Sequence, residues 1–233
     1  MRGDPKLHHS EFYALLDLLA NRLGGTRQLS TCTGRDSWPS HGVYFFCEPG
    51  ELRSDGNLRV VRVGTHALRS TSRTTLWKRL AQHRGSRVGG GNHRGSIFRQ
   101  HVGSALINRD RMPASSLEAW VSPRRRPEWS AAEADIEHKV SNHIGRMPFL
   151  WLAVPASTDG ASQRGYIERN SIGLLSNQLG PQEPPSTTWL GHHATSSKVR
   201  GSGLWNVNHV EEDYEPEFLT LMRGLMERIG ISA

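Results

Sequence analysis

Cysteine, long apolar runs and an N-terminal leader are scarce or missing in this 233-residue chain, and each absence excludes a class of protein. Only Cys32 and Cys47 are cysteines, too few for the disulfide framework of a small secreted protein. No run of 18 apolar residues exists, so we expect no membrane span. The N-terminal stretch MRGDPKLHHSEF lacks the apolar core of a secretory signal peptide. These absences favour the reducing cytoplasm, with no membrane partner.

Lysine is rare as well, although the chain is strongly basic. Only four of the 29 basic residues are lysines, an arginine bias typical of a GC-rich bacterial genome. The formal net charge is +7, yet the window from Arg53 to Arg111 holds 13 basic residues and two acids, a local net of +11. Guanidinium groups bind phosphate through paired hydrogen bonds. The window therefore predicts a polyanion-binding face, with a solvated surface as the alternative.

Apolar periodicity and turn residues predict an α+β chain. Ser10 is a candidate N-cap for a helix over residues 11–23, which Gly24 would end. Two alternating strands are expected over residues 42–47 and 58–63, joined by a turn at Asp55-Gly56. Further helices are expected over residues 74–84, 96–108, 131–144, from about 166, and over 215–229, with a buried strand at 149–155. A small sheet covered by helices follows from this order.

The stretch GSRVGGGNHRG, residues 85–95, is rich in glycine and basic. It lacks the Lys-Ser/Thr pair of a phosphate-binding P-loop, and it follows a predicted helix where a P-loop follows a strand. We interpret it as a mobile loop that could follow a DNA backbone, with a plain linker as the alternative.

Several short motifs follow one another in a defined order along the chain. Gly42-Val43-Tyr44 lies on the first strand of the hairpin, and Arg62-Val63-Gly64 ends the second. Arg79 and His83 follow on the next helix, and Glu168 lies on a later one. This order resembles the GIY-YIG nuclease superfamily, over about residues 42–177. The segment SGLWNVNHV, residues 202–210, looks like a segment of bacterial members of the restriction-enzyme type.

The resemblance implies a fold and an activity. The fold would be a small three-stranded mixed or antiparallel sheet flanked by helices, within a single domain of residues 1–233. Its catalytic core would comprise residues 42–83 and 149–180, with a helical insertion at 84–148 and a C-terminal extension at 181–233. The activity would be metal-dependent DNA cleavage, of a restriction or defence type. A non-catalytic nucleic-acid-binding module and a structure-specific repair nuclease are the alternatives.

The resemblance also implies roles for individual residues. Glu168 would hold one divalent cation, Mg²⁺ or Mn²⁺. Arg79 would bind the phosphate oxygens, and Arg62 would lie beside it. Tyr44 would position or deprotonate the attacking water, with His83 as a proton relay. Double-stranded DNA would be the partner, and paired cleavage of its two strands makes a homodimer plausible. The predicted DNA contacts are Arg73, Lys78, Arg84, Arg87, Arg94 and Arg99.

The chain also departs from the family pattern. Arg62 replaces the tyrosine that usually opens the second motif, and Thr65 replaces a frequent lysine. These changes leave the proton-transfer scheme open. The asparagine usual after the glutamate has two candidates, Asn170 and Asn177.

Overall fold

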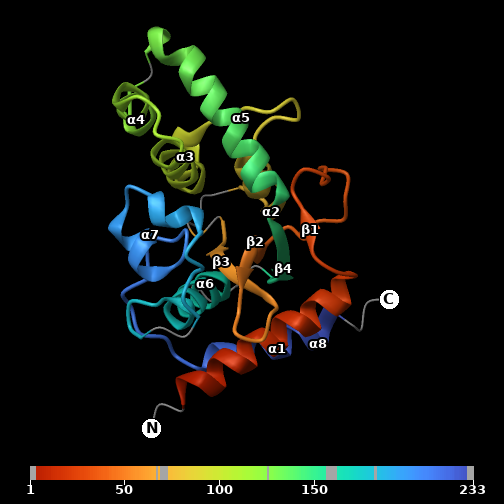
Figure 1. The fold of residues 1–233 in the computed structure, drawn as a ribbon. Coiled ribbons are helices and arrows are strands. Elements are labelled where there is room, and N and C mark those ends of the chain that lie inside the picture. Colours follow the sequence, from red (N-terminus) through yellow and green to blue (C-terminus); the bar gives the residue numbers. More distant parts are fainter. Residues whose placement is uncertain are drawn as a thin grey trace.

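A computed structural model describes residues 4–66, 68, 73–124, 126–155, 162–180 and 183–229 (Figure 1). Within these residues the chain is α+β, as predicted, with an antiparallel sheet in the middle and helices on both faces. None of the helices in this part of the chain combines the length and hydrophobicity that a membrane span needs.

The sheet is built on a long hairpin. Strand β2 (Gly42–Leu52) pairs with β3 (Leu58–Gly64) on one side and with β4 (Pro148–Ala153) on the other. A fourth strand, β1 (Arg27–Gln28), adds two residues at the outer edge of β4, so the order is β1-β4-β2-β3. Three strands were predicted, and the difference is this edge strand, whose two exposed residues carry no apolar alternation.

One face of the sheet is covered by helices from both ends of the chain. Alternate residues of β2, such as Val43 and Phe45, face α1 (Pro5–Leu23), α6 (Gln163–Leu175) and α8 (Glu217–Ile229). Helices α1 and α8 lie side by side at the bottom of Figure 1. Phe12 of α1 packs against Phe45 and against Phe218 of α8.

The opposite face carries the predicted helical insertion and the first part of the predicted C-terminal extension. Tyr44 and Phe46 point to this side, where they join a core formed with α2 (Leu76–Arg84), α3 (Ile97–Arg109) and α5 (Ser130–Arg146). The shorter helices α4 (Ala114–Val121) and α7 (Ser197–Ser202) pack outside them, and three 3₁₀ turns lie at His93–Gly95, Pro127–Trp129 and Leu190–His193. Trp189 and Trp205 of the extension are almost fully buried in the same core.

The ends of the helices follow simple capping rules. The first helix begins at Pro5, where the Asp4 side chain accepts from the amide of Lys6, and it ends at Gly24 in the left-handed conformation. The prediction of Ser10 as its N-cap is wrong, because the Ser10 hydroxyl lies inside the helix and donates to the Lys6 carbonyl.

Candidate active site

A buried hydrogen-bond chain joins the first motif to the helix that follows the second. The Tyr44 hydroxyl lies 2.8 Å from His83 Nε2, and His83 Nδ1 lies 2.9 Å from the Ser96 hydroxyl. Burial lowers the pKa of His83 well below its usual value, and the charges of Arg79, Arg62 and Arg99 lower it further. His83 is therefore a neutral imidazole, with one nitrogen available as an acceptor.

Gly64 is required where the two motif strands meet. It is the register partner of Tyr44, and a Cβ at this position would overlap the tyrosine ring and hydroxyl. The glycine of the second motif thus leaves the space in which the tyrosine of the first motif reaches His83.

Arg62 lies in the floor of the site. Its side chain is almost fully buried, its guanidinium lies 4.8 Å from the centre of the Phe98 ring, and it donates to the Trp205 carbonyl at 2.8 Å. Burial lowers the pKa of Arg62, while Tyr44 and Glu168 counteract that shift. Because guanidinium keeps its proton in proteins, Arg62 adds a fixed positive charge where the family pattern has a tyrosine.

A cleft of about 480 Å³ opens above Arg62. Glu168 of α6 and Arg79 of α2 line it together with Arg62, so three of the five predicted catalytic residues share one cavity. The other two, Tyr44 and His83, are fully buried and do not line it. The remaining lining residues are Thr65, His66, Leu68, Thr74, Gln82, Ile97, Ile172, Asn206, Val207, Asn208 and His209.

Glu168 is held by one oxygen only. Its Oε1 accepts from the Thr65 amide at 3.1 Å, and Oε2 accepts no hydrogen bond from the residues that the structure describes. Burial raises the pKa of Glu168, whereas Arg62 and the Thr65 amide oppose that shift. A half-buried carboxylate with a free oxygen in a polar cleft suits one hard divalent cation. The described residues contain no group of three or more side chains that could bind one metal ion together. Glu168 therefore suits a cation that has few protein ligands.

Arg79 stands at the other side of the cleft. Its guanidinium donates to Gln82 Oε1 at 2.7 Å, one turn further along α2. The remaining donors are placed to receive an anion in the cleft, and Arg62 below adds to the positive potential.

Two cleft residues directly after the second motif were not predicted as site residues. The Thr65 hydroxyl donates to the Gly42 carbonyl at 2.8 Å, which ties the two motif strands together. His66 lies 3.1 Å from the Ser40 carbonyl through Nε2 and stacks on His41. Burial lowers the pKa of His66 to about 4, so this imidazole is neutral at pH 7. Their position next to Gly64 is the signal that could have identified them.

Neither of the two candidate asparagines lies in the cleft, and the asparagines that line it come from another segment of the chain. Asn170 donates to the Tyr166 carbonyl and accepts from the Glu215 amide, and it does not line the cleft. Asn177 lies outside the cleft as well. Asn206 and Asn208 line it instead, and Asn206 pairs with both the amide and the carbonyl of Val63. The segment SGLWNVNHV, noted for its resemblance alone, thus supplies one wall of the site.

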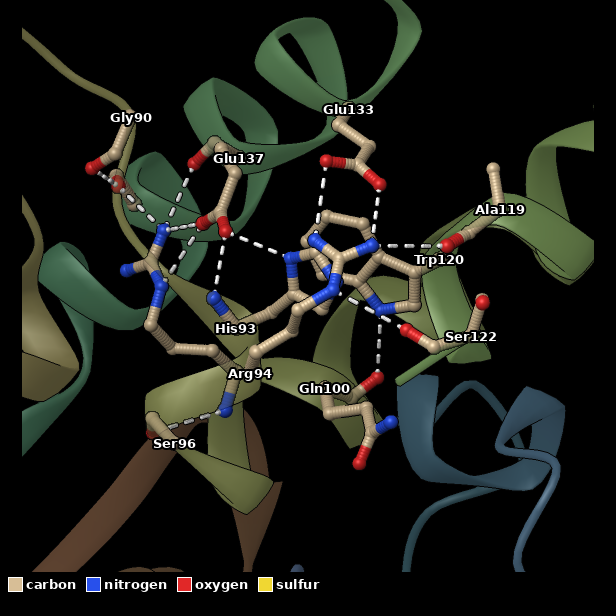
Figure 2. A network of polar contacts seen from close by, with 12 residues as sticks. Gly90, His93, Arg94, Ser96, Gln100, Ala119, Trp120, Ser122, Glu133 and Glu137 are labelled. Carbon is tan, nitrogen blue, oxygen red and sulfur yellow. Dashed lines mark hydrogen bonds and ion pairs between the residues drawn. The ribbon is translucent and has the colours of Figure 1, made fainter. Parts of the chain in front are cut away.

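Two of the predicted DNA contacts are contradicted by their surroundings (Figure 2). Arg99 is fully buried, and its guanidinium binds the Glu137 carboxylate and the carbonyls of Glu137 and His83. Arg94 binds Glu133 through two nitrogens and donates to three backbone carbonyls. Because these donors are occupied, neither side chain is available to a phosphate.

The same network orders the glycine-rich loop. Glu137 accepts from the amide and ring of His93, which stacks on Trp120, and Ser141 donates to the Gly90 carbonyl. Residues 85–95 are therefore anchored at several points to α5, and the expectation of a mobile loop is corrected.

The basic window is also more buried than its charge suggested. Arg53, Arg59 and Arg62 are almost fully buried, and Arg59 is paired with Glu51. Arg84 donates to the Cys32 carbonyl and lies against the Trp77 ring. Of the predicted DNA contacts, Arg73, Lys78 and Arg87 are exposed.

A family model described as a GIY-YIG domain matches residues 4–231. Searches of curated proteins and of solved structures found no match.

Proposed function

Because the chain belongs to the GIY-YIG nuclease superfamily, we propose that it is a divalent-metal-dependent DNA endonuclease that hydrolyses phosphodiester bonds. The observation that supports this best is the cleft that unites Glu168, Arg79 and Arg62, although these residues come from three separate elements. A bound Mg²⁺ or Mn²⁺ would stabilise the charge that develops on the leaving oxygen.

Each residue has a separate task in this proposal. The free oxygen of Glu168 would hold the cation, and the Thr65 amide keeps the carboxylate in place. Arg79 binds the non-bridging phosphate oxygens, where negative charge grows in the transition state. Arg62 supports that charge from below, and its own position depends on the Trp205 carbonyl.

Tyr44 and His83 form a hydrogen-bonded pair in the floor of the site. The phenol positions the attacking water, and the neutral imidazole 2.8 Å away orients the phenol by accepting its O–H. Ser96 on the far nitrogen holds the ring in place. Substrate binding has to uncover the hydroxyl, because the Tyr44 side chain has no exposed surface in the free protein.

The finer part of the proposal concerns the type of enzyme. We propose a bacterial restriction- or defence-type enzyme that acts on double-stranded DNA in the cytoplasm as a homodimer. The resemblance of residues 202–210 to restriction-type members supports it, since this segment forms one wall of the cleft. Exposed Arg73, Lys78 and Arg87 are the proposed contacts to the flanking DNA backbone. Cleavage of DNA at one defined sequence tests the restriction-type activity. Sedimentation of the protein with that DNA tests the homodimer.

The first prediction is that Glu168→Ala abolishes plasmid nicking in Mg²⁺ or Mn²⁺. The substitution removes the carboxylate that holds the cation, and the loss of one acid near phosphate leaves DNA binding intact or slightly stronger. Nicking with and without EDTA, next to a DNA-binding assay, measures both effects. Glu227→Ala, at an exposed position of α8, is the control with the same change of charge. A wild type that binds DNA and never cuts it supports the non-catalytic module instead.

A further inference from the structure

His209 adopts a backbone conformation that a histidine rarely takes. Its φ is +63°, and Arg111 is the other non-glycine residue with a positive φ among those described. A left-handed conformation is unfavourable for a residue with a Cβ, and such residues are concentrated at functional sites. This backbone places the His209 side chain on the wall of the cleft.

The His209 ring is held on one side by a carboxylate. Nδ1 lies 2.8 Å from Glu212 Oε1, and Oε2 of the same carboxylate accepts from Arg169 Nε at 2.7 Å. With the proton of Nδ1 donated to Glu212, the lone pair of a neutral His209 lies on Nε2. Arg169 is the neighbour of Glu168 on α6, so one chain of contacts fixes the histidine relative to the helix that carries the predicted metal ligand.

His209 and Glu168 line the same cleft. The Glu212 carboxylate that binds the His209 ring also binds Arg169, the residue next to Glu168 on α6. The imidazole and the Glu168 carboxylate therefore border one shared space that is open to a cation.

We infer that His209 is a second protein ligand of the divalent cation, through Nε2, with Glu212 as the carboxylate that orients it. Histidines that bind metals donate their other ring N–H to a carboxylate or a carbonyl, and that partner fixes the tautomer and the direction of the ring. Glu212, which also binds Arg169, stands in this position toward His209. The inference rests on the proposed metal-dependent activity of the same cleft.

A histidine ligand changes which cation the site prefers. Mg²⁺ favours an all-oxygen shell, whereas imidazole suits transition metals. A site made of Glu168 and His209 therefore takes Mn²⁺ in preference to Mg²⁺, and that preference depends on His209.

Titration of the DNA-free protein with Mn²⁺ and, separately, with Mg²⁺ tests the inference by calorimetry, with the electron paramagnetic resonance of Mn²⁺ as a second readout. His209→Asn removes the imidazole and keeps a residue type that tolerates a left-handed backbone. We expect it to weaken Mn²⁺ binding at least tenfold and Mg²⁺ binding by less. Glu212→Gln should weaken Mn²⁺ binding about 10–100-fold, the usual effect of losing an orienting partner.

Glu211→Gln is the matched control, because Glu211 is the adjacent residue, carries the same charge and pairs with Lys198 on the surface. It should leave Mn²⁺ affinity unchanged. A His209→Asn protein that binds Mn²⁺ as tightly as the wild type overturns the inference, whether or not it still cuts DNA. The proposed nuclease function is tested separately, since it falls only if the wild type cuts no DNA in either metal.

Discussion

At the scale of single residues, the packing of the two motif strands depends on the absence of a side chain at Gly64. Gly64 has an ordinary backbone conformation, so its role is steric: the Tyr44 hydroxyl occupies the place of the missing Cβ. The first motif can therefore direct its tyrosine to His83 only because the second motif ends in glycine.

We predict that Gly64→Ala displaces Tyr44 from His83. Overpacking a close-packed core costs about 1–3 kcal/mol, and a displacement of about 1 Å at a catalytic group can lower activity about 100-fold. Urea unfolding and plasmid nicking measure the two effects. Gly224→Ala is the control, because a Cβ there meets no atom within 4 Å and alanine favours the α8 helix. Full activity in Gly64→Ala would show that the hydroxyl position is unimportant.

At the scale of elements, the helical insertion supports the site through buried charges. Arg99 of α3 donates to the His83 carbonyl on α2, and Glu137 of α5 holds Arg99 from the other side. Three helices thus meet at one ion pair, and Ser96 at the start of α3 reaches the His83 ring.

We predict that Glu137→Ala destabilises the protein by about 3–5 kcal/mol, because it leaves the Arg99 guanidinium buried without a counter-charge. The double variant Glu137→Leu with Arg99→Met should recover much of that loss, since neither charge is then buried. Urea unfolding of the wild type and both variants measures the difference. Equal stability of the single variant and the wild type would mean that water replaces the carboxylate.

Helices and strands were easier to predict from the sequence than the ion pairs made by their charged side chains. Periodic apolar residues and turn signals are local, so the α+β class was predicted correctly and the predicted helices other than α1 began near the expected residues, whereas α4 and α7 were not predicted. The ion pairs of Arg94 and Arg99 depend on Glu133 and Glu137, about 40 residues further along the chain, and no local pattern reports that pairing. The two residues of β1 carry too short a pattern to predict.

The predicted site residues followed from the order of motifs, and the structure brings Arg62, Arg79 and Glu168 to one cleft. His209 and Asn206 were missed because their segment is distant in sequence and irregular. Its resemblance to restriction-type members was the only available signal, and it did not indicate a wall of the cleft.

At the scale of the whole molecule, Glu48 connects the sheet, the insertion and the C-terminal extension. Its buried carboxylate accepts from the indole N–H groups of Trp189 and Trp205 and lies 3.0 Å from His143 Nε2. Burial alone would raise the pKa of Glu48, but the ion pair with His143 and the hydrogen bonds from Trp205 and Trp189 outweigh burial and hold that pKa below its usual value.

A group with a lowered pKa in the folded state stabilises the protein above its unfolded pKa, near 4.3 for glutamate, and loses that effect as the pH falls through the folded pKa. We therefore predict that Glu48→Gln costs about 1.5–3 kcal/mol at pH 7, the range for hydrogen bonds to a charged group. The difference from the wild type should shrink below about pH 4. Urea unfolding between pH 3 and 7 measures it, with exposed Glu227→Gln as the control. A difference that is constant over this range would contradict the prediction.

The packing of α1 against α8 has a consequence for the protein during translation. Phe12 of α1 is made before its partner Phe218, which lies about 200 residues further along the chain. Until α8 is made, the part of the sheet face and of α1 that it covers stays exposed, and a chain that terminates prematurely offers chaperones and proteases this apolar surface. The wall of the cleft at residues 206–209 is also made after the other residues that line it. A chain that stops before these residues therefore lacks the completed cleft.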